Sequence, residues 1–193
     1  MVKPNKYKII LASGSPRRQQ FFKDMNLDFE IRLKEIDEKY PIHLKGAKIT
    51  NFLSELKANA FKNELSDDEL LITSDTLVML GDEVLGKPKD YEDAFKMLKK
   101  LSNKTHKVIT SVCFKTNQKT TLLSDTTRVT FKELKEESIR YYLDNYKPFD
   151  KAGSYGIQDW IGLVGISKIQ GSYSNVVGLP TEKVFAFLND FYL

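Results

Sequence analysis

Cysteine and histidine are scarce in this sequence, which has one cysteine and two histidines among its 193 residues. The lone cysteine, Cys113, cannot form an internal disulfide, and its apolar neighbours predict a buried, unreactive thiol. His43 and His106 have no partners at the spacing of a zinc site. We therefore expect a chain that folds without covalent or metal crosslinks and that works in the cytoplasm.

Long hydrophobic runs and a strong charge of one sign are also missing. No apolar stretch is long enough to cross a bilayer, so we expect neither a signal peptide nor a membrane partner. The 30 lysines and arginines exceed the 26 aspartates and glutamates only slightly, which does not require a polyanionic partner. Because basic residues are interspersed with acidic ones, without a basic helix or an aromatic platform, we expect no nucleic-acid partner.

The apolar content is sufficient for a folded core. Hydrophobic residues make up 41% of the chain, which excludes intrinsic disorder, and the length fits one domain or two lobes that share a core. Strand and helix patterns alternate early, whereas hairpins dominate later, so the predicted class is α/β with a mixed twisted sheet flanked by helices. We expect strands over 7–12, 29–33, 70–80, 83–85, 106–115, 121–131, 163–169 and 173–177, and helices over 16–25, 49–63, 90–101, 133–145 and beyond Pro180.

The segment Ser13-Gly14-Ser15-Pro16-Arg17-Arg18 follows a strand and opens a helix. Ser15 suits the N-cap, and a proline at the first helical position needs no amide partner. The helix N-terminus together with two guanidinium groups is a natural site for phosphate. The alternative is a capped helix with two solvated arginines. The glycine and lysine spacings of a Walker A loop or a dinucleotide fingerprint are absent.

Asp75 interrupts the strongly apolar strand at 70–80. A buried carboxylate is costly unless it is paired, metal-bound or at a sheet edge, so Asp75 is a candidate general base or metal ligand. The alternative is a hydrogen-bonded structural aspartate at a bulge. Further along, Gly86 and Pro88 restrain the loop that presents Lys87. Taken alone, Lys57 and Glu38 fit a solvated helix lysine and a loop acid.

Together these pieces resemble one family over nearly the whole chain, the Maf-type (septum-formation-associated) nucleotide pyrophosphatases. The matching segments are Leu11-Ala12-Ser13-Gly14-Ser15-Pro16-Arg17-Arg18, Asp37-Glu38, Leu56-Lys57-Ala58, Ser74-Asp75-Thr76, Gly86-Lys87-Pro88, Asp150-Lys151-Ala152-Gly153-Ser154-Tyr155-Gly156-Ile157-Gln158 and Ile169-Gln170-Gly171-Ser172-Tyr173-Ser174-Asn175-Val176-Val177-Gly178-Leu179-Pro180.

The resemblance implies a single Maf-like domain over 1–193 with two lobes around a deep nucleotide-binding cleft. It also implies a divalent cation, Mg²⁺ or Mn²⁺, and hydrolysis of nucleoside triphosphates to the monophosphate and pyrophosphate. The segment Tyr155-Gly156-Ile157-Gln158 is similar to the subgroup that acts on dTTP and UTP. A homodimer is suggested by the resemblance alone.

The resemblance also implies roles for single residues. Asp75 resembles the proton acceptor, and Glu38 a metal ligand beside it. The implied phosphate ligands are Ser13, Arg17, Arg18, Lys57 and Lys87, and the implied specificity positions are Arg17, Thr76 and Gln158. The Gln158 amide can accept from N3–H and donate to O4 of thymine or uracil, whereas cytosine offers a different edge. The alternative for Gln158 is a structural amide.

Three positions depart from the family pattern, and one of them, Thr181, where an apolar residue is usual, is expected to have no effect. Ser74 stands where alanine or glycine is usual, and its hydroxyl is a candidate to tune Asp75 through a hydrogen bond. Asp159 stands where the family typically has glycine, which bears on the local backbone and on base preference.

Two other functions stay open at this point. One is a nucleotide- or nucleic-acid-binding regulator of cell division whose hydrolysis is incidental. The other is a pyrophosphatase for another base, such as a modified guanine.

Overall fold

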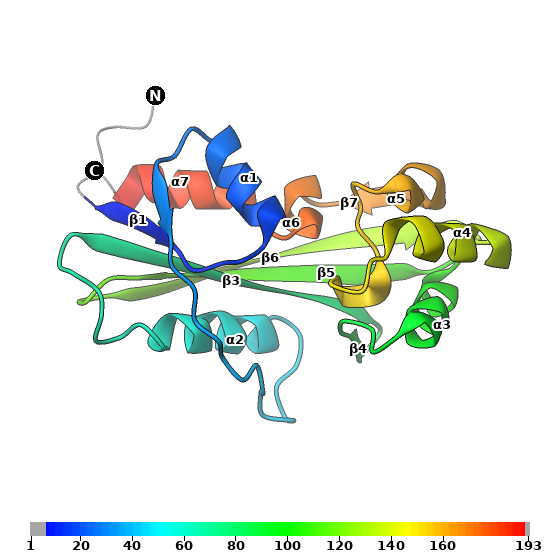
Figure 1. Cartoon of the computed structure of the whole chain (residues 1–193), viewed down its shortest axis with the longest axis horizontal. Coiled ribbons are helices and arrows are strands. Elements are labelled where there is room, and N and C mark those ends of the chain that lie inside the picture. The colour runs from blue at the N-terminus through cyan, green and yellow to red at the C-terminus, as the bar shows by residue number, and fades with distance from the viewer. Residues whose placement is uncertain (1–6, 192–193) are drawn as a thin grey trace. The chain divides into compact units, whose positions relative to one another are not determined.

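A mixed sheet with helices on its faces organises residues 7–191, the part of the chain that the computed structural model describes (Figure 1). The strands are β1 (Lys8–Leu11), β2 (Phe29–Ile31), β3 (Glu69–Leu80), β4 (Glu83–Leu85), β5 (Thr105–Lys115), β6 (Thr120–Phe131) and β7 (Ile166–Gln170). The helices are α1 (Pro16–Asp24), α2 (Ala47–Asn59), α3 (Tyr91–Leu101), α4 (Glu136–Tyr146), α5 (Trp160–Gly165), α6 (Tyr173–Val177) and α7 (Thr181–Phe191), with a 3₁₀ turn η1 (Ala152–Ser154). The predicted α/β class is confirmed.

The strand order is β2-β1-β3-β5-β6-β7, and β4 pairs with β3 outside this path. β1 lies parallel to both β2 and β3, with Ile9 opposite Phe29 on one side and Leu70 on the other. The β3–β4 and β6–β7 pairs are antiparallel. Parallel and antiparallel pairs therefore coexist, as the change from alternating elements to hairpins predicts.

The chain divides into two compact units, each built from separate stretches of sequence. The first unit takes the chain through Asp75, residues 110–125, and the chain from Gly178 onwards. The second unit takes residues 76–109 and 126–177. Strands β3, β5 and β6 each contribute residues to both units.

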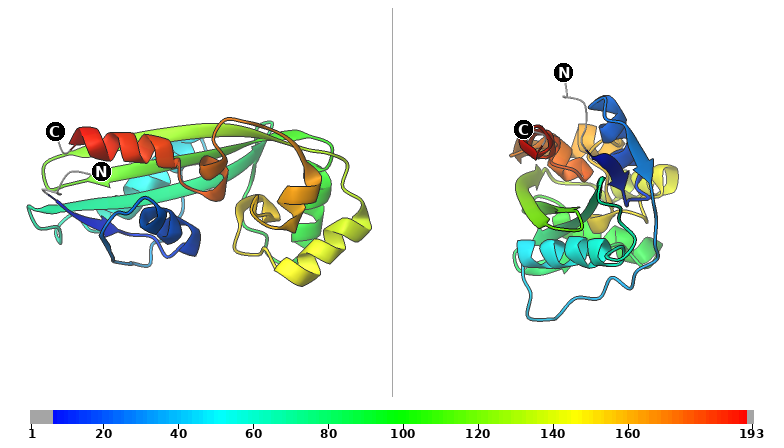
Figure 2. Two further views of the ribbon diagram at one scale, coloured as in Figure 1. Left: turned by 90° about the horizontal axis from the view of Figure 1, so that it is seen from above. Right: turned by 90° about the vertical axis from the view of Figure 1, so that its left-hand side faces the viewer.

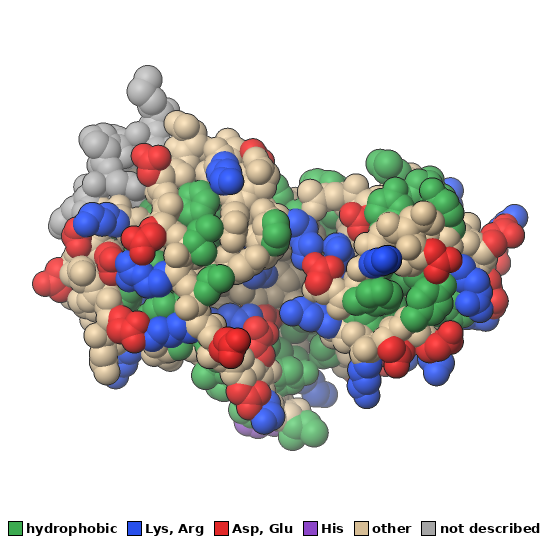
Figure 3. All heavy atoms as spheres, viewed as in Figure 1, with side chains coloured by type: hydrophobic (Ala, Val, Ile, Leu, Met, Phe, Trp, Pro, Cys, Tyr) green, Lys and Arg blue, Asp and Glu red, His purple; other side chains and the backbone are tan. Residues whose placement is uncertain are grey.

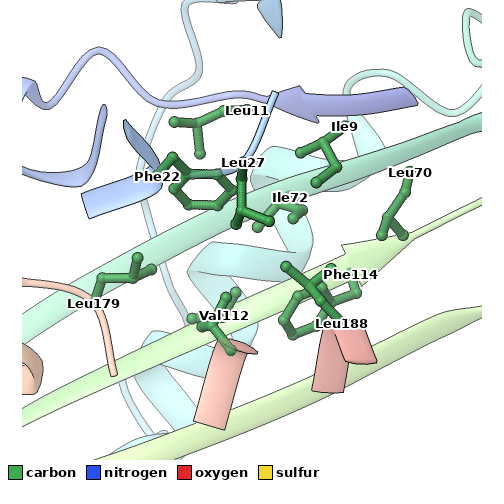
Figure 4. Packing of buried hydrophobic residues seen from close by; sticks show 11 residues of the cluster. Ile9, Leu11, Phe22, Leu27, Leu70, Ile72, Val112, Phe114, Leu179 and Leu188 are labelled. Carbon is green, nitrogen blue, oxygen red and sulfur yellow. The ribbon is translucent and has the colours of Figure 1, made fainter. Parts of the chain in front are cut away.

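In the first unit, helices cover both faces of the strands, as the right-hand view of Figure 2 shows for α2 and for α1 with α7. On the α1 and α7 face, Phe22 and Leu188 point toward Ile72 and Val112 (Figure 4). The opposite face packs strand residues against Ala58 and Phe61 at the end of α2, and includes Cys113. Burial raises the pKa of the Cys113 thiol to about 12, which confirms the expected inert cysteine.

In the second unit, α3 packs against α4 and η1. Asp90 caps α3 as expected, because its carboxylate accepts a hydrogen bond from Asp93 N at 2.8 Å. The Arg140 guanidinium of α4 lies 4.5 Å from the centre of the Phe95 ring of α3, a cation–π contact that joins the two helices.

Two of the expected strands are partly or wholly wrong. Residues 163–165 end α5, and only the following residues form β7. Residues 173–177 form α6 rather than a strand. There, Ser172 Oγ accepts from Asn175 N at 3.3 Å, and the buried Asn175 amide donates to Val108 O and Thr127 Oγ1. These tertiary hydrogen bonds favour a helical turn over the strand that the β-branched residues suggest.

None of the helices within residues 7–191 combines the length and apolar character needed to cross a bilayer.

On the face shown in Figure 3, acidic and basic side chains are interspersed. This mixing agrees with the charge pattern of the sequence.

His106 lies in an aromatic cluster of the second unit and is 1% exposed. Its Nε2 shares a 2.7 Å hydrogen bond with the Tyr155 hydroxyl, and its ring stacks on Phe131 with the centroids 5.5 Å apart. Its Nδ1 has no hydrogen-bond partner among the described residues. Burial lowers the pKa of His106 to about 4.

We predict that His106 makes the protein less stable in acid. In the unfolded chain His106 binds a proton below its ordinary pKa of about 6.5, whereas the folded state resists protonation down to about 4, so stability present at neutral pH is lost as pH falls through this window. Between pH 7 and 4.5, the free energy of unfolding of the wild type should fall by about 2–3 kcal/mol more than that of His106→Gln. Urea unfolding at both pH values measures this, and equal losses in the two proteins would contradict it.

Candidate functional site

Asp75 is buried in β3 and forms an ion pair with a lysine from α2. Its carboxylate Oδ1 lies 2.7 Å from Lys57 Nζ, and the two side chains are only 10% and 16% exposed. The same ammonium lies 3.1 Å from Oε1 of Glu38, which belongs to the loop between β2 and α2. The structure thus brings Lys57, Glu38 and Asp75 together around one ammonium group.

The register between α2 and β3 explains why Lys57 meets Asp75. Thr73 Oγ1 donates to the carbonyl of Ser54 at 2.6 Å. Thr73 and Asp75 are two residues apart on one face of a strand, and Ser54 and Lys57 are three apart on one face of a helix. The hydrogen bond and the ion pair therefore lie side by side, and together they hold the helix in place along the strand.

The environment of Asp75 makes its carboxylate more basic than usual. Burial raises the pKa of Asp75, whereas the charge and the hydrogen bond of Lys57 oppose this rise, as does the charge of Arg18. A carboxylate with a raised pKa accepts a proton more readily once ionised, and the neighbouring cations stabilise that ionised form. Asp75 therefore has a hydrogen-bond partner, as the alternative of a structural aspartate expects. That partner, Lys57, is a charged ammonium group.

Ser74 does not tune Asp75. Its hydroxyl is buried and has no hydrogen-bond partner among the described residues. Successive side chains of a strand point to opposite faces, so Ser74 faces away from Asp75. The hypothesis of a direct hydrogen bond between them is therefore wrong.

The Arg18 guanidinium is held by the protein itself. Its Nε donates to Gly178 O at 2.8 Å, and its Nη1 donates to Ser74 O at 3.0 Å and to Ser13 Oγ at 3.4 Å. Burial lowers the pKa of Arg18, and the charge of Asp75 opposes this. Arg18 thus joins α1 to β3 and to the segment before α7, so it is not a solvated arginine.

The loop before α1 uses Ser13 rather than Ser15 for its local hydrogen bond. Ser15 is at the N-cap position, yet its hydroxyl makes no capping bond. Instead, Ser13 Oγ accepts from Ser15 N at 3.3 Å, and Ser13 is buried. Arg17, in the first turn of α1, is half-buried.

The carboxylates of the first unit could bind a divalent cation only together with other ligands, such as substrate phosphates and water. Within the described residues, no group of three or more histidine, cysteine, aspartate and glutamate side chains is placed to hold a metal ion. Glu38 and Asp75 nevertheless both approach Lys57 Nζ. Mg²⁺ commonly binds one or two carboxylates together with substrate phosphates and water, and this donor set fits that pattern.

Lys87, in the second unit, extends from a loop that is fixed by its neighbours. Gly86 O accepts a hydrogen bond from Gly153 N at 3.0 Å, and Pro88 is buried. Gly153 has a φ of 69°, a left-handed conformation that favours glycine, and a Cβ there would lie 3.1 Å from the methyl groups of Val78. The Lys87 side chain itself is exposed.

Gln158 lies in the same unit, and its side chain is also exposed. No hydrogen bond of this side chain occurs within residues 7–191, so the observations do not favour the structural amide. Thr76 directly follows Asp75 in β3 and is half-buried. Tyr142 is a further polar residue of this unit, and its hydroxyl bonds to Gly156 and Asp159.

We predict that Arg18 is needed for stability, because its forked guanidinium bonds two carbonyl groups that a lysine ammonium cannot satisfy together. Arg18→Lys should lower the free energy of unfolding by about 1–3 kcal/mol, the cost of leaving a buried acceptor unpaired. The control is Arg128→Lys, at an exposed position of β6, which should change it little. Urea unfolding measures both, and unchanged stability of Arg18→Lys would contradict the structural role.

Comparisons with known proteins place the chain among proteins of similar length. The family model described as "Maf-like protein" matches residues 8–191. The chain is 68% identical to a protein of Flavobacterium psychrophilum over 94% of this chain and 93% of that one. It is 65% identical to a protein of Flavobacterium johnsoniae over 96% of each chain, and 54% identical to one of Christiangramia forsetii over 95% and 94%. All three relatives bear the name "dTTP/UTP pyrophosphatase". The chain belongs to the Maf-like protein family.

Proposed function

We propose that this protein is a nucleoside triphosphate pyrophosphatase that hydrolyses dTTP and UTP to the monophosphate and pyrophosphate. The observation that carries the proposal is the buried Asp75 carboxylate held 2.7 Å from Lys57 Nζ with Glu38 beside it. The names of the relatives, which are up to 68% identical over most of their length, support the substrate class.

In the proposed reaction, Asp75 acts as the general base. Its carboxylate takes a proton from a water molecule whose oxygen forms a bond to the α-phosphorus. The bond between that phosphorus and the oxygen bridging to the β-phosphate breaks, and pyrophosphate leaves. Lys57 keeps Asp75 ionised before the transfer and stabilises negative charge on the phosphate during it.

The triphosphate needs several cations, and the chain offers them at restrained positions. We assign Arg17, Lys57 and Lys87 to phosphate oxygens, with Arg17 and Thr76 also contributing to specificity. We also assign to the phosphates Ser13 and Arg18, which fix the loop before α1. Glu38 and Asp75 would hold Mg²⁺ or Mn²⁺, which when bound neutralises phosphate charge and polarises the phosphoryl oxygens.

Base recognition is assigned to Gln158. Its exposed amide can accept from N3–H and donate to O4 of thymine or uracil, and its hydrogen-bonding capacity is not used within the described residues. The site is proposed to lie in a cleft of a cytoplasmic enzyme. The lone buried cysteine is compatible with that location.

We predict that Asp75→Asn abolishes most turnover while the protein still folds. The amide keeps the shape of the side chain but cannot accept the proton of the water, and losing a general base typically costs about 10²- to 10⁴-fold in rate. The measurement is pyrophosphate release from dTTP and UTP with Mg²⁺ or Mn²⁺, with nucleotide binding followed separately by calorimetry. Asp82→Asn, in the exposed turn between β3 and β4, is the matched control.

The outcomes of this assay separate the candidate functions. Near-normal turnover of Asp75→Asn would contradict its role as base. If the wild type turns over no triphosphate with any metal, the result would favour a nucleotide-binding regulator. If it prefers a modified guanine nucleotide, the result would favour a pyrophosphatase specific for that base. Orthophosphate as the first product would contradict the assigned bond cleavage.

We predict that Gln158→Ala lowers selectivity for dTTP and UTP. Two lost neutral hydrogen bonds correspond to about a 5- to 150-fold loss in kcat/KM for these substrates, whereas CTP and GTP should change little. Gln118→Ala, in the exposed turn between β5 and β6, is the control. Equal proportional losses for all four nucleotides in Gln158→Ala would show that the amide does not recognise the base.

A further inference from the structure

The loop that presents Gln158 is closed by a tyrosine from another element. The Tyr142 hydroxyl, on α4, donates to Asp159 Oδ2 at 2.6 Å and accepts from Gly156 N at 3.0 Å. The backbone closes the same turn, because Asp159 N donates to Gly156 O at 3.1 Å. One phenol therefore connects the two ends of a four-residue segment that contains Gln158.

Two glycines let this segment pack more tightly than other residues would allow. A Cβ at Gly156 would lie 2.6 Å from Asp159 Oδ2, and a Cβ at Gly162 would lie 1.9 Å from Ile157 O. Real Cβ atoms do not approach other heavy atoms so closely, so the turn could not keep this geometry with a side chain at either position. The segment is thus packed against the first turn of α5 and bonded to α4.

The chemical state of Tyr142 suits a lasting contact. Its side chain is fully buried, and its pKa is raised by burial and by the hydrogen bond with Asp159, so it remains a neutral donor. A phenol O–H donating to a carboxylate is a charge-assisted hydrogen bond, which is stronger than a neutral one. The position before Asp159 is Gln158, whose side chain is exposed while the backbone on both sides is held.

From this geometry we propose that Tyr142 and Asp159 are positioning residues, which orient Gln158 for binding the nucleobase of the substrate. The inference rests on the proposed role of Gln158 in base recognition. A side-chain amide on a fixed backbone has less conformational freedom to lose when it binds, and its donor and acceptor keep one orientation relative to the site. Asp159 is therefore a functional part of the loop, because glycine at this position could not accept the Tyr142 hydrogen bond.

The test compares kcat and KM for dTTP, UTP, CTP and GTP in Tyr142→Phe and Asp159→Ala. Each variant removes the charge-assisted hydrogen bond, so each should lower kcat/KM for dTTP and UTP about tenfold, mainly by raising KM, with less than about a twofold change for CTP and GTP. Asp159→Asn keeps an acceptor for the phenol and should restore most of the selectivity. Tyr141→Phe is the matched control, since Tyr141 is a half-exposed neighbour on α4 whose ring contact with Trp160 survives the change.

A double variant shows whether the two residues act through Gln158. In a Gln158→Ala background, Tyr142→Phe should cause no further loss of selectivity, because the side chain that it positions is gone. A further loss in the double variant would overturn the proposal, as would equal losses for all four nucleotides in Tyr142→Phe. If Gln158→Ala alone leaves selectivity intact, base recognition by Gln158 fails and this inference fails with it. If Gln158→Ala loses selectivity while Tyr142→Phe and Asp159→Ala keep it, only this inference fails.

Discussion

The contact between Lys57 and Asp75 is the interaction on which the account of this protein depends. An aspartate within an apolar strand is expensive to bury, and a lysine ammonium at 2.7 Å offsets that cost. The same contact favours the ionised carboxylate and so opposes the rise in pKa that burial causes. One ion pair therefore stabilises the buried aspartate and also serves the general base that we propose, with Glu38 as a further partner of the lysine.

The polar groups of each unit are held by the protein in different ways. In the first unit, Arg18 bonds two backbone carbonyls and so fixes the part of β3 that holds Asp75. In the second unit, glycines permit close backbone contacts around Lys87 and Gln158, whose side chains remain exposed. Rigid backbone beneath an exposed donor is the arrangement that reduces the entropic cost of binding.

Much of the fold could be predicted from the sequence, because hydrophobic period and turn residues are local signals. The strand that contains Asp75 and the helix that begins after Asp90 follow from such signals and are confirmed. The region around α5 and α6 could not be predicted in this way. Asn175 bonds to the distant carbonyl of Val108, and Gly162 packs closely against the carbonyl of Ile157. Tertiary hydrogen bonds there override the strand propensity of the local sequence.

The residues of the site could be proposed from their types and from the family resemblance, but their partners could not. The sequence does not indicate that the Ser74 hydroxyl faces away from Asp75. It also does not indicate that the Arg18 guanidinium bonds to backbone carbonyls. Likewise, the departure at Asp159 acquires a meaning only when Tyr142 is found beside it. Partner identity depends on the three-dimensional register of α1, α2 and α4 with their neighbours.

In the proposed reaction a water molecule attacks the α-phosphorus, and isotope labelling shows which phosphorus atom gains the solvent oxygen. The measurement is hydrolysis of dTTP in water enriched in ¹⁸O, followed by mass spectrometry of both products. We expect one solvent oxygen in the monophosphate and none in pyrophosphate, because the new bond forms at the α-phosphorus. Solvent oxygen in the pyrophosphate would instead place the attack on the β-phosphorus and rule out the proposed reaction.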